Sequence, residues 1–203
     1  MIDHIVKAKS MMDIREIVNT IKKHCGFFDR LQFPIMFFWE QIIPKIFHDY
    51  RFLYVEDDEL NGVEAYTDHN LKIVKVKTSV YLKALEGSSK DLFTIAHEIG
   101  HLFLHDGEAL VFARTNERFP AYKSAEWQAN YFAAEMLMGS HLVIDMSIDE
   151  IVNACNVSKK AAKIQLEHAI SERKRAFVVV FTNLVIAVTR LKTNPFIEEV
   201  MKL

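Results

Sequence analysis

Two histidines four residues apart, His97 and His101, lie in an apolar run and constrain the fold more than any other feature of this chain. A helix places both imidazoles on one face, because one helical turn takes about 3.6 residues. Two imidazoles stacked in this way can bind one metal ion. Glu98 lies beside them, too near in sequence to be a third ligand but well placed to take a proton from metal-bound water. This H-E-x-x-H pattern is typical of zinc-dependent peptidases.

The residues around the motif favour a buried helix. Apolar side chains flank it on both sides, and Ser88 with Asp91 three residues later predicts an N-cap with a capping box. With 9 histidines in the chain, the same pattern could also arise by chance in a core helix. Once buried, however, two histidines and a glutamate need polar partners, and one metal ion satisfies all three. We therefore favour a zinc site over core histidines.

A catalytic zinc site needs a third protein ligand. Ser124 predicts the start of a helix that runs to about Met138 and carries two carboxylates, Glu126 and Glu135. Glu126 lies in the first turn, with Asn130 one turn further along the same face. This pairing suits a carboxylate ligand and an amide that hydrogen-bonds a ligand imidazole. Glu135 lies a half-turn off that face, so we favour Glu126 as the third ligand.

The composition is that of an ordinary globular chain. Its 203 residues, 50% hydrophobic and 26% charged, are enough for one compact domain with a core. The formal net charge of −2 argues against direct binding of nucleic acid. Cys25 and Cys155 form no disulfide framework, and the first residues lack the pattern of a signal peptide. The apolar stretch 177–188 is shorter than the roughly 20 residues that a membrane-spanning helix needs. We expect a cytoplasmic protein without a membrane partner.

The hydrophobic pattern predicts an α+β fold. Residues 1–48 are rich in phenylalanine, and we expect them to be helical, with a kink or an early helix end at Pro44. Strand-like stretches at 51–55, 63–66 and 71–77 predict a small antiparallel three-stranded sheet. A zincin-like metal core of two helices and a C-terminal helical segment then complete the fold.

Three segments follow from this pattern, and we expect them to pack as one compact unit. They are an N-terminal helical segment (1–48), a zinc metallopeptidase core (49–140) and a C-terminal helical segment (141–203). Within the last segment, residues 177–191 could form either a hairpin or one buried helix, since periodicity does not decide between them.

The C-terminal segment also contains two capped stretches within residues 147–169. Ser147 with Glu150 predicts a capping box for one short helix, and Ser158 opens a second helix with several lysines. The pair could be a helix-turn-helix. The acidic balance of the chain favours two packing helices with solvated lysines instead.

The motif helix and the helix after it together resemble the ImmA/IrrE family of metallopeptidases, small gluzincin-type enzymes of bacteria and their mobile elements. The resemblance rests on residues 97–105 and 126–133 and extends from about Val63 to about Ala169. It implies that His97, His101 and Glu126 bind zinc and that Glu98 is the catalytic carboxylate. It further implies Glu98-assisted attack of zinc-bound water on a peptide bond in a partner repressor of the XRE type. Such a repressor would control a phage, a mobile element or a stress response.

A peptidase also needs a group that stabilises the oxyanion. Tyr122, Arg118 and His105 are candidates, and the sequence does not choose among them. His105 lies about 80° around the helix from His97, which favours a role beside the ligands or at the rim. The alternative function is a zinc-stabilised protein that binds and regulates a repressor or another partner without cutting it.

Overall fold

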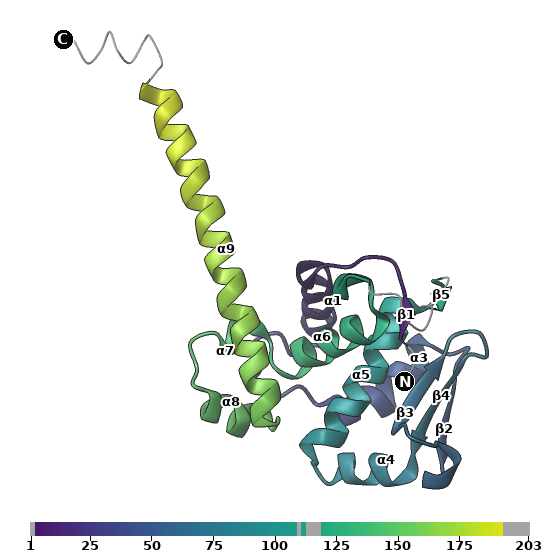
Figure 1. Cartoon of the computed structure of the whole chain (residues 1–203). Helices are drawn as coiled ribbons and strands as arrows, with labels where there is room; N and C mark the ends of the chain where they lie inside the picture. The colour runs from purple at the N-terminus through teal and green to yellow at the C-terminus, as the bar shows by residue number, and fades with distance from the viewer. Residues whose placement is uncertain (1–2, 109–110, 113–118, 193–203) are drawn as a thin grey trace, which may run out of the picture.

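The computed structural model describes residues 3–108, 111–112 and 119–192, and it confirms the α+β class. A helical body and a small sheet lie together, and the last helix extends away from them (Figure 1). The elements, in chain order, are β1 (His4–Ile5), α1 (Met11–His24), α2 (Ile35–Phe37), the π-helical η1 (Phe38–Ile42), α3 (Ile43–Ile46), β2 (Arg51–Val55), the 3-10 turn η2 (Asp57–Glu59), β3 (Ala65–Asp68), β4 (Ile73–Lys77), α4 (Thr78–Leu85), α5 (Ser89–His105), β5 (Val111–Phe112), the 3-10 turn η3 (Ala121–Lys123), α6 (Ala125–Leu137), α7 (Ser140–Val143), α8 (Ile148–Cys155) and α9 (Lys159–Lys192).

The sheet has three strands, as expected, but it is mixed, so the prediction of a fully antiparallel sheet is wrong. Its order is β2-β4-β3, in which β4 pairs parallel to β2 and antiparallel to β3. A simple meander would put β3 in the middle. The central place instead goes to β4, whose Ile73, Val74 and Val76 are buried, because a central strand of a covered sheet is the one that needs the most apolar side chains. The more polar β3 lies at the edge.

A second, two-stranded sheet was not predicted. β1 pairs antiparallel with β5, and Ile5 forms a bridge with Ser124 just before α6. Each strand is too short and irregular for a period-2 pattern to reveal it. The pairing fastens the start of the chain to the segment between α5 and α6.

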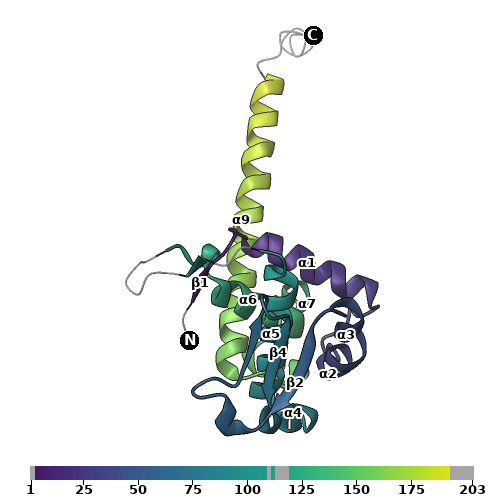
Figure 2. The same ribbon diagram turned by 90° about the vertical axis from the view of Figure 1, so that its right-hand side faces the viewer.

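The N-terminal helical segment contributes to the core. α1 lies against α6 (Figure 2), and Phe33 and Phe38 are buried in the main core cluster. The aromatic residues of this segment therefore serve mainly as core, although Phe37 is exposed. Near Pro44 the chain passes from α2 through π-helical η1 into α3. Pro44 lies in the first turn of α3, where a residue needs no N–H for a hydrogen bond within that helix.

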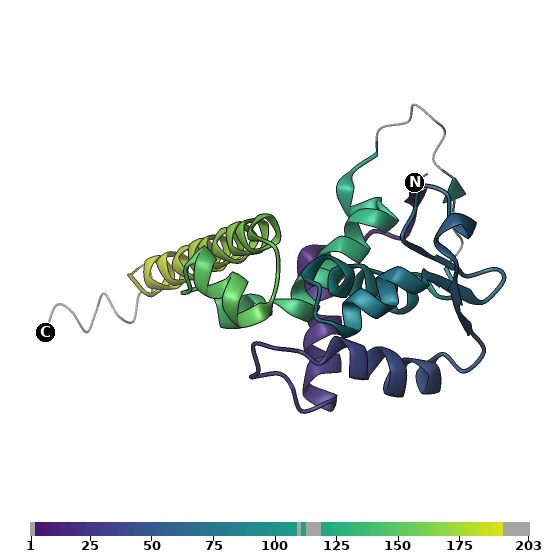
Figure 3. The same cartoon turned by 90° about the horizontal axis from the view of Figure 1, so that it is seen from below.

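The C-terminal region differs from the prediction in one respect. The capping box of Ser147 and Glu150 on α8 is confirmed, but the second helix continues as the single 34-residue α9. A hairpin at 177–191 is therefore wrong. The buried helix is wrong too, because Phe177 is 70% exposed and the next four residues are also exposed. α9 extends away from the body (Figure 1 and Figure 3), and within the described part of the chain no other element covers the side chains at 177–181. No helix in the described part of the chain is long and apolar enough to cross a membrane.

Candidate metal centre

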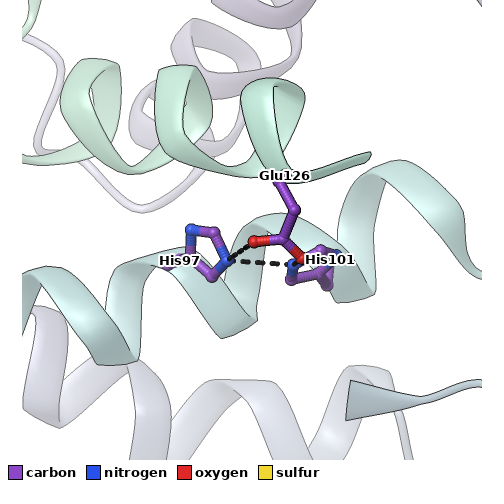
Figure 4. Close-up of side chains that lie close together, drawn as sticks. All are labelled: His97, His101 and Glu126. Carbon is purple, nitrogen blue, oxygen red and sulfur yellow. Dashed lines mark hydrogen bonds and ion pairs between the residues drawn. The ribbon is translucent and has the colours of Figure 1, made fainter. Parts of the chain in front are cut away.

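Two helices bring the predicted ligands together. α5 presents His97 and His101 on one face, and the first turn of α6 presents Glu126 opposite them (Figure 4). The two imidazole Nε2 atoms lie 3.0 Å apart. One Glu126 oxygen lies 3.4 Å from Nε2 of His97, and the other lies 3.6 Å from Nε2 of His101. Donor atoms of two residues on α5 and of one residue 25 positions further along the chain thus converge on one point.

These separations fit a zinc ion. With Zn–N and Zn–O distances of about 2.0–2.1 Å, two ligands at corners of a tetrahedron lie about 3.3–3.4 Å apart. The three observed separations, 3.0, 3.4 and 3.6 Å, bracket this value. Two imidazoles and one carboxylate are also the donor set of many catalytic zinc sites, which keep a fourth position open. The residues present therefore fit the metal.

The close approach of α5 and α6 depends on the glycine within the motif. A Cβ atom on Gly100 would lie 3.1 Å from the backbone of Ala129 and 3.2 Å from Cβ of Phe132. Contacts this short are tighter than most Cβ atoms make, so a side chain at this position would push the two helix backbones slightly apart. Ser124 fixes the start of α6, because its hydroxyl accepts a hydrogen bond from the backbone N–H of Trp127. Together these features set Glu126 across from the histidines.

Asn130 holds His97 as the sequence suggested. Its side-chain oxygen lies 3.1 Å from Nδ1 of His97. Because an amide oxygen only accepts, Nδ1 must carry the proton and donate it. The lone pair of Nε2 is then free and points toward His101 and Glu126, which is the tautomer that a metal ligand needs.

A longer chain of hydrogen bonds fixes His101. The amide nitrogen of Gln128 donates to the backbone oxygens of Lys7 and Tyr122 at 2.9 and 2.8 Å, so its oxygen faces Nε2 of His105 at 3.2 Å. His105 therefore donates from Nε2 and accepts at Nδ1, where Nδ1 of His101 lies 3.1 Å away. His101 must donate in that bond, which leaves its own Nε2 lone pair free.

His105 thus lies behind His101, fully buried. The sequence left two positions open for His105, beside the metal-binding residues or at an exposed rim. The structure places it at the first of these, beside His101. Burial lowers the pKa of His105 to about 3, so the ring is neutral, as the chain of hydrogen bonds requires. Gln128 was missed in the sequence, although a buried amide within an apolar helix is a signal that could have drawn attention to it.

Glu98 lies within the same helix turn but is bound by a different partner. It is only 2% exposed, and its Oε2 accepts a hydrogen bond of 2.7 Å from the hydroxyl of Thr67 on β3. Burial raises the pKa of Glu98 to about 7, whereas the nearby His97 ring and the Thr67 hydroxyl oppose the rise. The sequence did not reveal Thr67, because only the mixed sheet brings β3 against α5.

The other candidates lie elsewhere. Tyr122 is 47% exposed, and among the described residues its hydroxyl makes no hydrogen bond with the three donors. Arg118 lies outside the described residues. Glu135 is fully buried in a separate network, where it pairs with Arg15 and accepts from Ser140. At α5, Ser88 is the N-cap residue, but its hydroxyl donates to Asp91 and the expected capping box does not form.

Comparison with known proteins agrees with this geometry. A family model described as the IrrE N-terminal-like domain, of peptidase family M78, matches residues 53–167, more than half of the chain. No curated protein matches the chain. Among solved structures, a Mycobacterium tuberculosis transcriptional regulator is similar in fold, with a TM-score of 0.50 and 13% identity. The match covers 74% of this chain and 45% of that one. The extent of the family match, which includes both helices of the metal centre, shows that the chain belongs to the IrrE N-terminal-like domain family.

Proposed function

We propose that this protein is a zinc-dependent endopeptidase that cleaves, and so inactivates, a partner transcriptional repressor. The observation that carries the proposal is Glu98, a buried carboxylate beside the three donors that is not itself one of them. A zinc site with only a structural role has no need of such a group. Membership of a peptidase family supports the reaction class, and the resemblance to ImmA/IrrE proteins supports a repressor as the substrate.

The roles of the residues follow from their contacts. His97, His101 and Glu126 would hold the ion, and Asn130 and the His105–Gln128 pair would orient the two imidazoles. A bound zinc ion supplies Lewis acidity, which lowers the pKa of a coordinated water toward about 7 and polarises a carbonyl.

Glu98 would move the protons of the reaction. Thr67 binds Oε2 of this carboxylate, so Oε1 would be the oxygen that takes a proton from water and returns it to the leaving amine. The hydrogen bond from Thr67 keeps the carboxylate from rotating, which holds Oε1 in place between the two transfers.

The test measures zinc content and cleavage side by side. Wild type, His97→Ala, Glu126→Ala and Glu98→Gln would each be analysed for zinc and assayed with the repressor encoded next to the gene. Glu167→Gln, an exposed residue on α9, is the matched control for the Glu98 change. We expect His97→Ala and Glu126→Ala to lose zinc and Glu98→Gln to keep zinc but lose cleavage.

Two results would overturn the proposal. If Glu98→Gln binds zinc and cleaves like wild type, the carboxylate has no catalytic role. If wild type binds zinc and the repressor but does not cut it, the protein is a zinc-stabilised binder.

A further inference from the structure

A groove of about 640 Å³ lies beside the metal centre. Three elements form it: the first turns of α5, the exposed side of α6 and the N-terminal part of α9. Its apolar lining includes Phe93, Trp127 and Ile164, all of which keep some exposure to solvent. A groove of this size has room for one or two large side chains of a bound ligand.

The groove is continuous with the metal centre through one residue. Asn130 lines the groove, and the same side chain hydrogen-bonds His97. Thr94, one turn before His97 on α5, also lines it. A polypeptide held with one bond at the metal centre would therefore extend along α5 directly into the groove.

The rim of the groove is positively charged. Lys90 and Lys160 both line it and are exposed. Lys90 has one distant partner, Glu64 at 3.4 Å, and no ion pair of Lys160 is found within the described part of the chain. The first turn of α9 contains no acidic residue, so its N-terminal dipole adds to the positive potential. An acidic side chain is complementary to this rim.

We propose that this groove is the specificity site of the enzyme and binds a substrate segment in which a large apolar residue lies next to an acidic residue. The apolar side chain would fill the space between Phe93, Trp127 and Ile164. The acidic one would meet Lys160 at the rim. This inference rests on the proposed function, since it identifies the groove's occupant as the substrate of the metal centre.

The test selects peptides without requiring cleavage. Zinc-loaded, full-length Glu98→Gln protein would be used to select from a random dodecapeptide library displayed on phage, and the dissociation constants of the enriched peptides would be measured. Two groove changes would be added separately to this background, Ala161→Trp, which fills the groove, and Lys160→Glu, which reverses the charge at its rim. Lys163→Trp and Lys163→Glu are the matched controls, because Lys163 is exposed on the same helix and does not line the groove.

We expect the enriched peptides to share a large apolar residue beside aspartate or glutamate. Ala161→Trp should weaken their binding about 10- to 100-fold, which corresponds to the loss of one buried apolar side chain. Lys160→Glu should weaken the same peptides and should favour peptides with a basic residue in place of the acidic one. Neither Lys163 control should change binding or zinc content.

The proposal fails if no peptide is enriched, if the enriched peptides lack this pair of residues, or if Ala161→Trp selects the same peptides with unchanged affinity. A groove filled by a second copy of the chain would show instead as a dimer that Ala161→Trp dissociates. Failure of the proposed function has a different signature. In that case the peptides bind as described, but wild-type protein with zinc cuts neither them nor the repressor.

Discussion

Replacement of Gln128 by leucine tests whether the buried hydrogen bonds behind His101 prepare it to bind a metal. The leucine side chain has a similar size but cannot accept a hydrogen bond from Nε2 of His105. One way for His105 to avoid a buried, unpaired N–H is to move its proton to Nδ1. That nitrogen would then face the Nδ1–H of His101 at 3.1 Å, so His101 would have to carry its proton on Nε2, the atom that points to the metal position.

Two independent values give the free energy that zinc binding should lose in Gln128→Leu. A buried donor left without an acceptor costs about 1–3 kcal/mol. Loss of a residue that orients a metal-bound histidine typically lowers metal affinity about 10- to 100-fold, or about 1.4–2.7 kcal/mol. The two ranges agree, because in both cases one hydrogen bond of the chain that orients a metal-binding imidazole is lost. We therefore expect Gln128→Leu to bind zinc 10- to 100-fold more weakly than wild type.

The matched control is Gln128→Glu. Both changes remove the N–H groups that bind the backbone oxygens of Lys7 and Tyr122, so both disturb the same contacts. Only glutamate keeps an oxygen that can accept from His105. Zinc affinity would be measured by competition with a coloured chelator, and the tautomer of His101 would be read from its ¹⁵N chemical shifts in the metal-free protein.

We expect Gln128→Glu to bind zinc at least as tightly as wild type and to show a proton on Nδ1 of His101. If the two variants lose affinity equally, the damage comes from the backbone contacts and the hydrogen-bond chain has no part in binding. The hydrogen-bond chain likewise does not control the tautomer of His101 if Gln128→Leu leaves that tautomer as it is in wild type.

Three further predictions concern the parts of the fold that support the centre. Thr67→Val should keep zinc but slow repressor cleavage about tenfold, because it frees the Glu98 carboxylate to rotate. Thr67→Ser, which keeps the hydroxyl, should cleave like wild type. Equal cleavage rates in the two variants would contradict this role of Thr67. Gly100→Ala should lower the free energy of unfolding by about 1–3 kcal/mol, because the Cβ of the alanine would push α5 and α6 apart. A denaturant titration measures this change. An unchanged free energy of unfolding would show that the two helices can separate at no cost. Lys22 is fully buried, and burial lowers its pKa from 10.5 to about 8. The unfolded chain therefore binds more protons between these values, and this residue makes stability rise with pH from about 8 to 10.5. Lys22→Met should remove that rise, as measured by unfolding at a series of pH values, and an identical pH profile in both proteins would refute it.

The motif residues and their helices were accessible from the sequence for a physical reason. Helical spacing alone puts His97 and His101 on one face, and helix caps such as Ser124 and Ser147 are local signals. The partnership of Glu126 with Asn130 follows from the same spacing, one turn apart on one face. These features depend on residues a few positions from one another, so no knowledge of the packed structure is needed to find them.

The sheet order and the length of α9 could not be obtained in this way. Strand-like patterns locate β2, β3 and β4, but which strand lies in the centre depends on what covers each face. Periodicity likewise could not show that the apolar residues from Phe177 onward belong to a helix that leaves the body. Their hydrophobicity suggested burial, whereas the path of α9 leaves them exposed.

The sequence by itself determined the chemistry that this protein can hold, two imidazoles and a carboxylate next to a spare glutamate. Only the tertiary structure decided how that chemistry is supported. Thr67 comes to Glu98 from a strand 31 positions away, and Gln128 reaches His105 across the contact between α5 and α6. Such pairs have no fixed spacing along the chain. The Gln128–His105 pair forms because Gly100 lets α5 and α6 approach closely. Both pairs form because buried polar groups must find partners in one another.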